Sequence, residues 1–121
     1  MTEAQRALEA LYRARDAVHE ASSMQAKTRQ PLLSELHAFG SAIVSTLAGL
    51  GQLSTVLSHQ VGTFDEDEVE QAAVSDDPVD KLRVAGMHMS RLDDLLAQAV
   101  KDAGRYWTAM ESVELHTRSE Q

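Results

Sequence analysis

Few residues in this 121-residue chain have the types and spacing that metal or catalytic chemistry requires. Asp16 and His19 stand three positions apart, so a helix would carry both side chains on one side. Two ligands are too few, because protein metal sites use three or four, and a surface hydrogen bond is the favoured interpretation. His88 lies between Met87 and Met89, but neighbouring residues of a helix point in different directions, so these three side chains do not converge on a metal.

Other motifs of enzymes are missing as well. The chain has no cysteine, which excludes thiolate chemistry and disulfides. The segment GLGQLS, residues 49–54, lacks the third glycine of a dinucleotide-binding loop, and no strand pattern precedes it. We therefore expect a non-enzymatic protein with no catalytic residue, no bound metal and no cofactor.

Negative charge is concentrated in one stretch, FDEDEVEQAAVSDDPVD, residues 64–80. It holds eight of the 19 acidic residues and none of the 11 basic ones, so the net charge of −8 is local and the remainder is neutral. Without a basic surface, direct binding to nucleic acid is not expected. The favoured interpretation is a solvated connector, and the alternative is a docking surface for a basic protein partner. The residues of that candidate docking surface are Asp65, Glu66, Asp67, Glu68 and Glu70.

Apolar residues recur at spacings of three and four through almost the whole chain, which predicts helices. Thr2 can cap a first helix over residues 3–27, whose apolar stripe is mostly alanine. Pro31 suits the first turn of a second helix over residues 31–62, and Gly62 suits its end. The apolar side of the second helix, called the leucine face below, comprises Leu32, Leu36, Phe39, Ile43, Leu47, Leu50, Leu57 and Val61.

A third helix is the most strongly indicated element. Asp77 and Pro78 are a typical cap and first residue for a helix over residues 78–115, whose apolar stripe has the alternating spacing of coiled coils. Residues 64–77 then form an acidic connector between the second and third helices. The predicted fold is all-α: a single domain over residues 1–121, built as an elongated bundle of three long helices that self-associates.

The second helix is unusual because no Asp, Glu, Lys or Arg occurs among the 29 residues 36–64. That run is long enough to cross a membrane, but polar residues interrupt it and Asp65 to Glu68 follow in place of a basic flank, so we expect no membrane span. Its polar residues share one face, opposite the leucines. A polar face that avoids charge indicates burial against another helix, since charged side chains are almost never fully buried unpaired. This reasoning predicts an oligomer interface formed by His37, Ser41, Ser45, Gln52, Thr55 and His59.

Helix length also bears on assembly. The third helix would be about 60 Å long, whereas a compact chain of this size has a radius of gyration of about 14 Å. The bundle must therefore be elongated, or a helix must break. The favoured break is Gly49–Gly51, because glycine costs up to ~1 kcal/mol at an interior helix position. An elongated unit with overhanging apolar stripes favours a homo-oligomer, with a dimer as the favoured state.

In size, acidity and lack of cysteine the chain resembles the Trp-x-Gly helical-hairpin substrates of type VII secretion. That family has a Trp-x-Gly turn between two helices and a Tyr-x-x-x-Asp/Glu signal near the C-terminus. Here Trp107 is followed by Thr108 and Ala109, and Tyr106 has Met110 four residues later, so neither motif is present at these positions. The resemblance covers general character only, and Trp107 with Tyr106 is expected to close one end of the core.

The leading hypothesis is a cytoplasmic interaction protein that works through protein contacts: an adaptor, a regulator or a component of an assembly, including one encoded by a phage or mobile element. One alternative is a type VII secretion-like helical-hairpin substrate or its partner. Another is a small ligand-binding helical bundle that uses His37 and His59. The cytoplasm is expected because the N-terminal residues lack the apolar stretch of a signal peptide.

Overall fold

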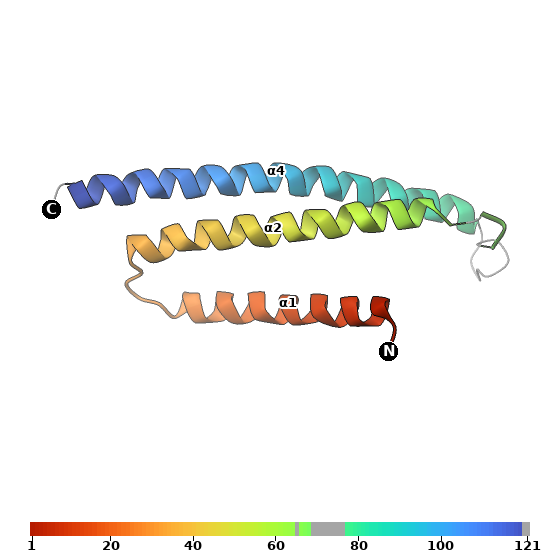
Figure 1. Cartoon of the computed structure of the whole chain (residues 1–121), viewed down its shortest axis with the longest axis horizontal. Coiled ribbons are helices and arrows are strands. Elements are labelled where there is room, and N and C mark those ends of the chain that lie inside the picture. The colour runs from red at the N-terminus through yellow and green to blue at the C-terminus, as the bar shows by residue number, and fades with distance from the viewer. Residues whose placement is uncertain (65, 69–76, 120–121) are drawn as a thin grey trace. The chain divides into compact units, whose positions relative to one another are not determined.

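The computed structural model describes residues 1–64, 66–68 and 77–119, with the side chains of 117–119 excepted. They form three long helices, α1 (Glu3–Ala26), α2 (Leu33–Gly62) and α4 (Pro78–Ser119), and residues 66–68 are also helical (Figure 1). No strand occurs in this described part of the chain. The prediction of an all-α fold with long helices is confirmed.

The helices begin and end close to the bounds expected from the sequence. α1 ends one residue earlier than expected, α2 starts two residues later, and α4 continues to Ser119, four residues further than expected. α2 is continuous through Gly49 and Gly51, so of the two alternatives, an elongated bundle or a broken helix, the break at these glycines does not occur. Glycine keeps its backbone N–H and C=O groups, so the helical hydrogen bonds continue through both sites, and the entropic cost of two glycines is small in a helix of 30 residues.

The chain divides into two compact units, Met1–Leu32 and Leu33–Gln121, and the expectation of a single domain stays a prediction. The first unit contains α1, which begins with a reciprocal capping box. The Thr2 hydroxyl accepts a hydrogen bond from the Gln5 amide at 3.1 Å, and the Gln5 side chain accepts one from the Thr2 amide at 2.8 Å. None of the residues of α1, all of which the structure describes, is buried.

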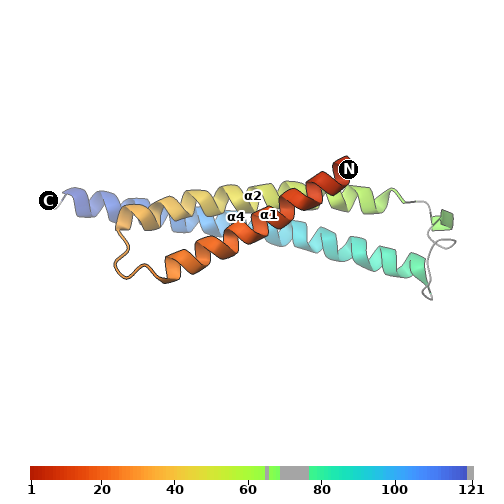
Figure 2. The same cartoon turned by 90° about the horizontal axis from the view of Figure 1, so that it is seen from below.

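The second unit is an antiparallel hairpin of α2 and α4, which run side by side in opposite directions (Figure 1) and cross at a small angle (Figure 2). Three contacts fix their register. Val61 lies against Gly86, Ser54 bonds to Asp93, and Gly40 packs on Trp107. Equal steps along α2 and back along α4 separate these contacts, so the two helices stay in register over most of α2.

The α2 positions that face α4 have alternating spacings of three and four, but they are small or polar more often than leucine. These half-buried or buried positions are His37, Gly40, Val44, Leu47, Gly51, Ser54, Ser58 and Val61. On α4 the matching positions, all half-buried except Trp107 at 38% exposed, are Leu82, Gly86, Met89, Asp93, Leu96, Val100, Ala103, Trp107, Met110 and Glu114. α4 therefore packs on the border between the leucine face and the polar face of α2, and not on the centre of the leucine face.

The hairpin has little interior. Among the described residues no hydrophobic side chain is buried, and the buried residues of α2 are Gly40 and Ser54. Two parallel cylinders can shield only one stripe of each other, so most apolar side chains keep part of their surface in water. Hydrophobic burial at about 25 cal/mol per Å² is the main favourable term in folding, and this hairpin leaves much of it unused.

Candidate functional site

The closest contact between the helices lies near the N-terminal end of α2. A Cβ atom at Gly40 would stand 2.8 Å from Cβ and 3.0 Å from Cα of Trp107, which no real side chain tolerates. Gly40 is therefore required by the close approach of α4. On one side of this contact, the Tyr106 hydroxyl donates a hydrogen bond to the Leu36 carbonyl at 2.9 Å. Trp107 and Tyr106 both contact α2 but are 38% and 41% exposed, so the expectation that they close one end of a core stays a prediction.

His37 is part of the same cluster. Its ring lies with its centroid 6.3 Å from that of Trp107, at an interplanar angle of 29°, and Nδ1 lies 2.8 Å from Oε2 of Glu114. This polar contact is largely shielded from water, because the side chains of His37 and Glu114 are 25% and 13% exposed. Nδ1 donates to the carboxylate, and the buried Nε2 atom of His37 has no hydrogen-bond partner among the described residues.

A second polar contact lies in the middle of the hairpin, where Asp93 occupies a position of α4 that faces α2. Its Oδ1 atom accepts hydrogen bonds from the hydroxyls of Ser54 at 2.8 Å and Thr55 at 2.9 Å. Each hydroxyl also reaches the Gly51 carbonyl, at 2.9 and 3.0 Å, and has one proton to donate to either acceptor. The sequence patterns did not identify Asp93, because its partners are almost forty residues away along the chain.

The predicted polar interface residues of α2 separate into two groups. His37 and Thr55 bond to α4, and Ser41 is half-buried beside them. Ser45, Gln52 and His59 are exposed. Part of the uncharged polar face thus contacts another helix of the same chain, while the rest keeps open contact with solvent in the hairpin.

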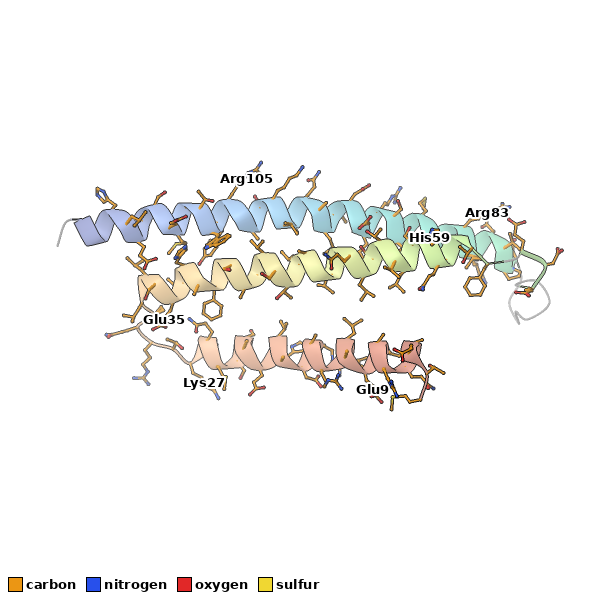
Figure 3. The ribbon with its side chains drawn as sticks, in the orientation of Figure 1. Glu9, Lys27, Glu35, His59, Arg83 and Arg105 are labelled. Carbon is orange, nitrogen blue, oxygen red and sulfur yellow. The ribbon has the colours of Figure 1, made fainter. Side chains whose placement is uncertain are left out.

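The two histidines of the ligand-binding alternative do not meet. His37 and His59 are 22 residues apart on one straight helix, which corresponds to about 33 Å. His37 faces Glu114 and Trp107, whereas His59 is exposed near the other end of α2 (Figure 3). A single small ligand cannot contact both side chains.

The side of the hairpin next to the Tyr106–Leu36 bond is apolar on both helices. It is formed by the residues that immediately precede every second contact position, and we call it the apolar face. Its members are Leu36, Ile43, Leu50 and Leu57 from α2, and Ala85, Leu92, Ala99, Tyr106 and Val113 from α4. Ile43, Leu92 and Val113 are 45%, 44% and 46% exposed. In an antiparallel pair the positions that precede the contacts lie on the same side of both helices, as the Tyr106–Leu36 bond shows.

The acidic connector is described only in part. Asp65 and Glu70 lie outside the described residues, while Glu66, Asp67 and Glu68 are helical and exposed. Glu66 forms an ion pair with Arg83 of α4 at 3.3 Å. Both side chains are more than half exposed, so the pair contributes at most about 1 kcal/mol to stability.

The residues first considered for metal chemistry do not gather. Asp16 bonds to Arg15 at 3.0 Å on the exposed surface of α1, and Met89 is half-buried against α2 while Met87 and His88 are exposed. Within the described part of the chain, no three side chains among His, Cys, Asp and Glu form a group that could hold a metal ion.

One helix, α2, is long and apolar enough to cross a membrane by length and composition alone. This is weak evidence, because helices that pack inside soluble proteins pass the same test. In the hairpin, α2 lies beside a helix with a strongly polar outer side: Figure 3 shows Arg105 of α4 pointing away from α2. Arg91 and Lys101 on α4 are exposed as well.

No protein-family model matches the chain, and no curated protein or solved structure matches it. A proposal for its function therefore depends on the geometry of its helices.

Proposed function

We propose that the chain is a non-enzymatic interaction protein that acts through protein–protein contacts and forms a homo-oligomer, with a dimer as the favoured state. The observation that carries the proposal is the hairpin of α2 and α4 with no buried hydrophobic side chain among the described residues. A 121-residue chain needs buried apolar surface to offset the loss of conformational entropy, and a pair of helices alone supplies little of it. Packing against another protein surface would supply the rest.

The same features support a cytoplasmic adaptor, regulator or assembly component. The polar contacts of α2 with Asp93 and Glu114 and the charged outer side of α4 suit an aqueous setting better than a lipid bilayer. The acidic residues that precede α4 offer a second contact area for a basic partner, since Glu66, Asp67 and Glu68 are exposed. An association of that kind would weaken as salt is added.

Sedimentation and thermal unfolding of the full chain test this proposal. At tens of micromolar we expect a mass of at least twice 13.3 kDa and a melting temperature that rises with protein concentration. A folded chain with the mass of one copy, and with a melting temperature independent of concentration, would contradict the proposed self-association.

A further inference from the structure

The side of the hairpin that carries the apolar face is long and wide. α2 is about 45 Å long, and two packed helices about 8–10 Å apart present a side about 18–20 Å wide. Their product is about 850 Å², which is the outline of the whole side with its polar border included. A stable protein–protein interface covers about 800 Å² on each partner. One side of this hairpin thus has the area that a dimer needs.

The chemistry of the face suits an identical partner. Residues 36–64 carry no charged side chain, and the α4 members of the face are uncharged as well. Two identical faces can therefore meet without bringing like charges together, although each chain has a net charge of −8. Lys81 and Asp102 precede other contact positions of α4, so charged side chains lie at the border of the face and not within it.

The sizes of the side chains are also complementary between copies. The α2 row of the face is leucine and isoleucine throughout, whereas the α4 row places Ala85 and Ala99 on either side of Leu92. Small residues on one helix leave space for large residues of a facing helix, which is how packed layers reach native density. The best fit places α2 of one copy over α4 of the other.

We infer that the apolar face is the dimer interface, and that two hairpins pack face to face into a four-helix bundle. The inference builds on the proposed function by naming the partner, a second copy of this chain, and the surface that binds it. It differs from the interface expected from the sequence, because Ser45, Gln52 and His59 lie on the other side of the hairpin and would stay in solvent.

Two substitutions on α2 test which side of the hairpin forms the interface, the apolar face or the opposite polar side. Ile43 and Ser45 are both exposed and stand two positions apart, so they point in nearly opposite directions. Ile43→Glu and Ser45→Glu add the same charge and the same helix-forming side chain. We expect Ile43→Glu to weaken the dimer at least 100-fold in sedimentation equilibrium of the full chain, and Ser45→Glu to change the dissociation constant less than threefold.

The possible outcomes distinguish failure of the inferred interface from failure of the proposed self-association. Dissociation by Ser45→Glu alone would overturn the apolar face as interface and leave the proposed self-association intact. A wild-type chain with the mass of one copy would overturn both, and would mean that α1 or nothing covers the face. Flotation of the wild-type chain with phosphatidylcholine vesicles, in place of dimer formation, would also overturn both.

A second measurement covers the case in which Ile43→Glu unfolds, as circular dichroism would show. The chain has no cysteine, so Ile43→Cys and Ser45→Cys each introduce a single thiol. We expect the maleimide reaction of Ile43→Cys to slow at least tenfold between low and high protein concentration, and that of Ser45→Cys to stay constant. Equal rates for both variants at all concentrations would overturn the inference.

Discussion

Gly40 is the residue that sets how closely the two helices approach. Alanine forms helices better than glycine by about 1 kcal/mol, so an exposed glycine in a helix is normally improved by the change. At Gly40 the new methyl group would overlap backbone and Cβ atoms of Trp107, neither of which can rotate away. The helices would have to separate and lose the contacts of His37 and Tyr106 nearby.

We therefore expect Gly40→Ala to lower the free energy of unfolding by about 1–3 kcal/mol, as overpacked substitutions do. Gly104→Ala is the matched control, because a Cβ atom there meets nothing within 4 Å. It should raise stability by up to about 1 kcal/mol. Urea unfolding followed by circular dichroism measures both, and a stabilised Gly40→Ala variant would contradict the close contact.

Asp93 places a carboxylate among apolar contact positions. A polar residue at such a position is known to fix the register of paired helices at a cost in stability. In this hairpin the bonds to Ser54 and Thr55 form only when α2 and α4 have their observed register. A shift by one turn would place the carboxylate opposite Gly51 or Ser58 and would break its paired bonds to Ser54 and Thr55.

Replacing this carboxylate by an apolar side chain should therefore raise the stability of the hairpin and make its helix register less specific. We expect Asp93→Leu to raise the melting temperature and to give broadened or duplicated amide signals in NMR spectra, because several registers become accessible. Asp93→Asn keeps an acceptor oxygen and should leave one set of sharp signals. A single sharp set for Asp93→Leu would show that the register is fixed elsewhere.

The contacts of single residues in α2 show how much the sequence could predict. The uncharged polar face of α2 predicted contact with another helix, and His37 and Thr55 do contact one. The sequence could not identify that helix as α4, because the acceptors Asp93 and Glu114 look like ordinary solvent-facing acids until the register is known. Likewise Gly40 was indistinguishable from Gly49 and Gly51, since only the structure shows which glycine faces an indole.

At the scale of elements, the start of α4 differs from the expected cap. Asp77 was expected as the N-cap of this helix. N-cap residues are typically extended, but the φ of Asp77 is 57°, in the left-handed region. Its carbonyl still accepts a hydrogen bond from the Lys81 amide at 3.3 Å, as the carbonyl before a helix does. Aspartate tolerates this region better than most residues, and glycine adopts it without strain.

We expect Asp77→Gly to stabilise the chain by about 0.5–1 kcal/mol, because the release of strain exceeds the few tenths lost with a glycine cap. Asp77→Ala should destabilise it by about 1 kcal/mol, since alanine neither caps nor favours positive φ. Thermal unfolding at fixed protein concentration compares the two variants. If Asp77→Gly proved the less stable, the aspartate side chain would matter more than its backbone.

The helices themselves were predictable from local signals, which do not depend on how the helices pack. These signals are the spacing of three and four between apolar residues and the terminal residues Thr2, Pro78 and Gly62. What the spacing could not give is the side on which α4 packs. The leucine face of α2 was expected to meet the other helices, but α4 lies on its border, where small side chains allow the backbones to approach. Hydrophobicity alone favours the leucines, whereas the Gly40 and Ser54 contacts need small residues.

In the whole molecule, net charge and apolar surface have opposite effects on the proposed association of two copies. Each copy has a net charge of −8, so two copies repel at long range, while the uncharged apolar face attracts at contact. Salt screens the repulsion over a Debye length of about 10 Å at 0.1 M and leaves apolar contact unweakened.

Self-association should therefore strengthen with salt. We expect the dissociation constant of the dimer to fall severalfold between about 0.05 M and 0.5 M sodium chloride, as sedimentation equilibrium would show. An association that salt weakens would mean that charged contacts, such as those of the acidic connector, hold the copies together. Binding of a basic partner to the connector should respond in that opposite sense.

From the antiparallel register we expect the contacts between α2 and α4 to form in a definite order during folding. Val61 and Gly86 flank the connector and are close in sequence, whereas Gly40 and Trp107 are far apart, so the entropy of loop closure is lowest near the connector and grows toward the other end. The helices should zip from the connector outward, and the ring stack of His37 on Trp107 should form last. Trp107 is the only tryptophan, so its fluorescence in stopped-flow refolding reports the final step, after the helical signal has developed. The single tryptophan is thus an intrinsic fluorescence probe for completion of the hairpin.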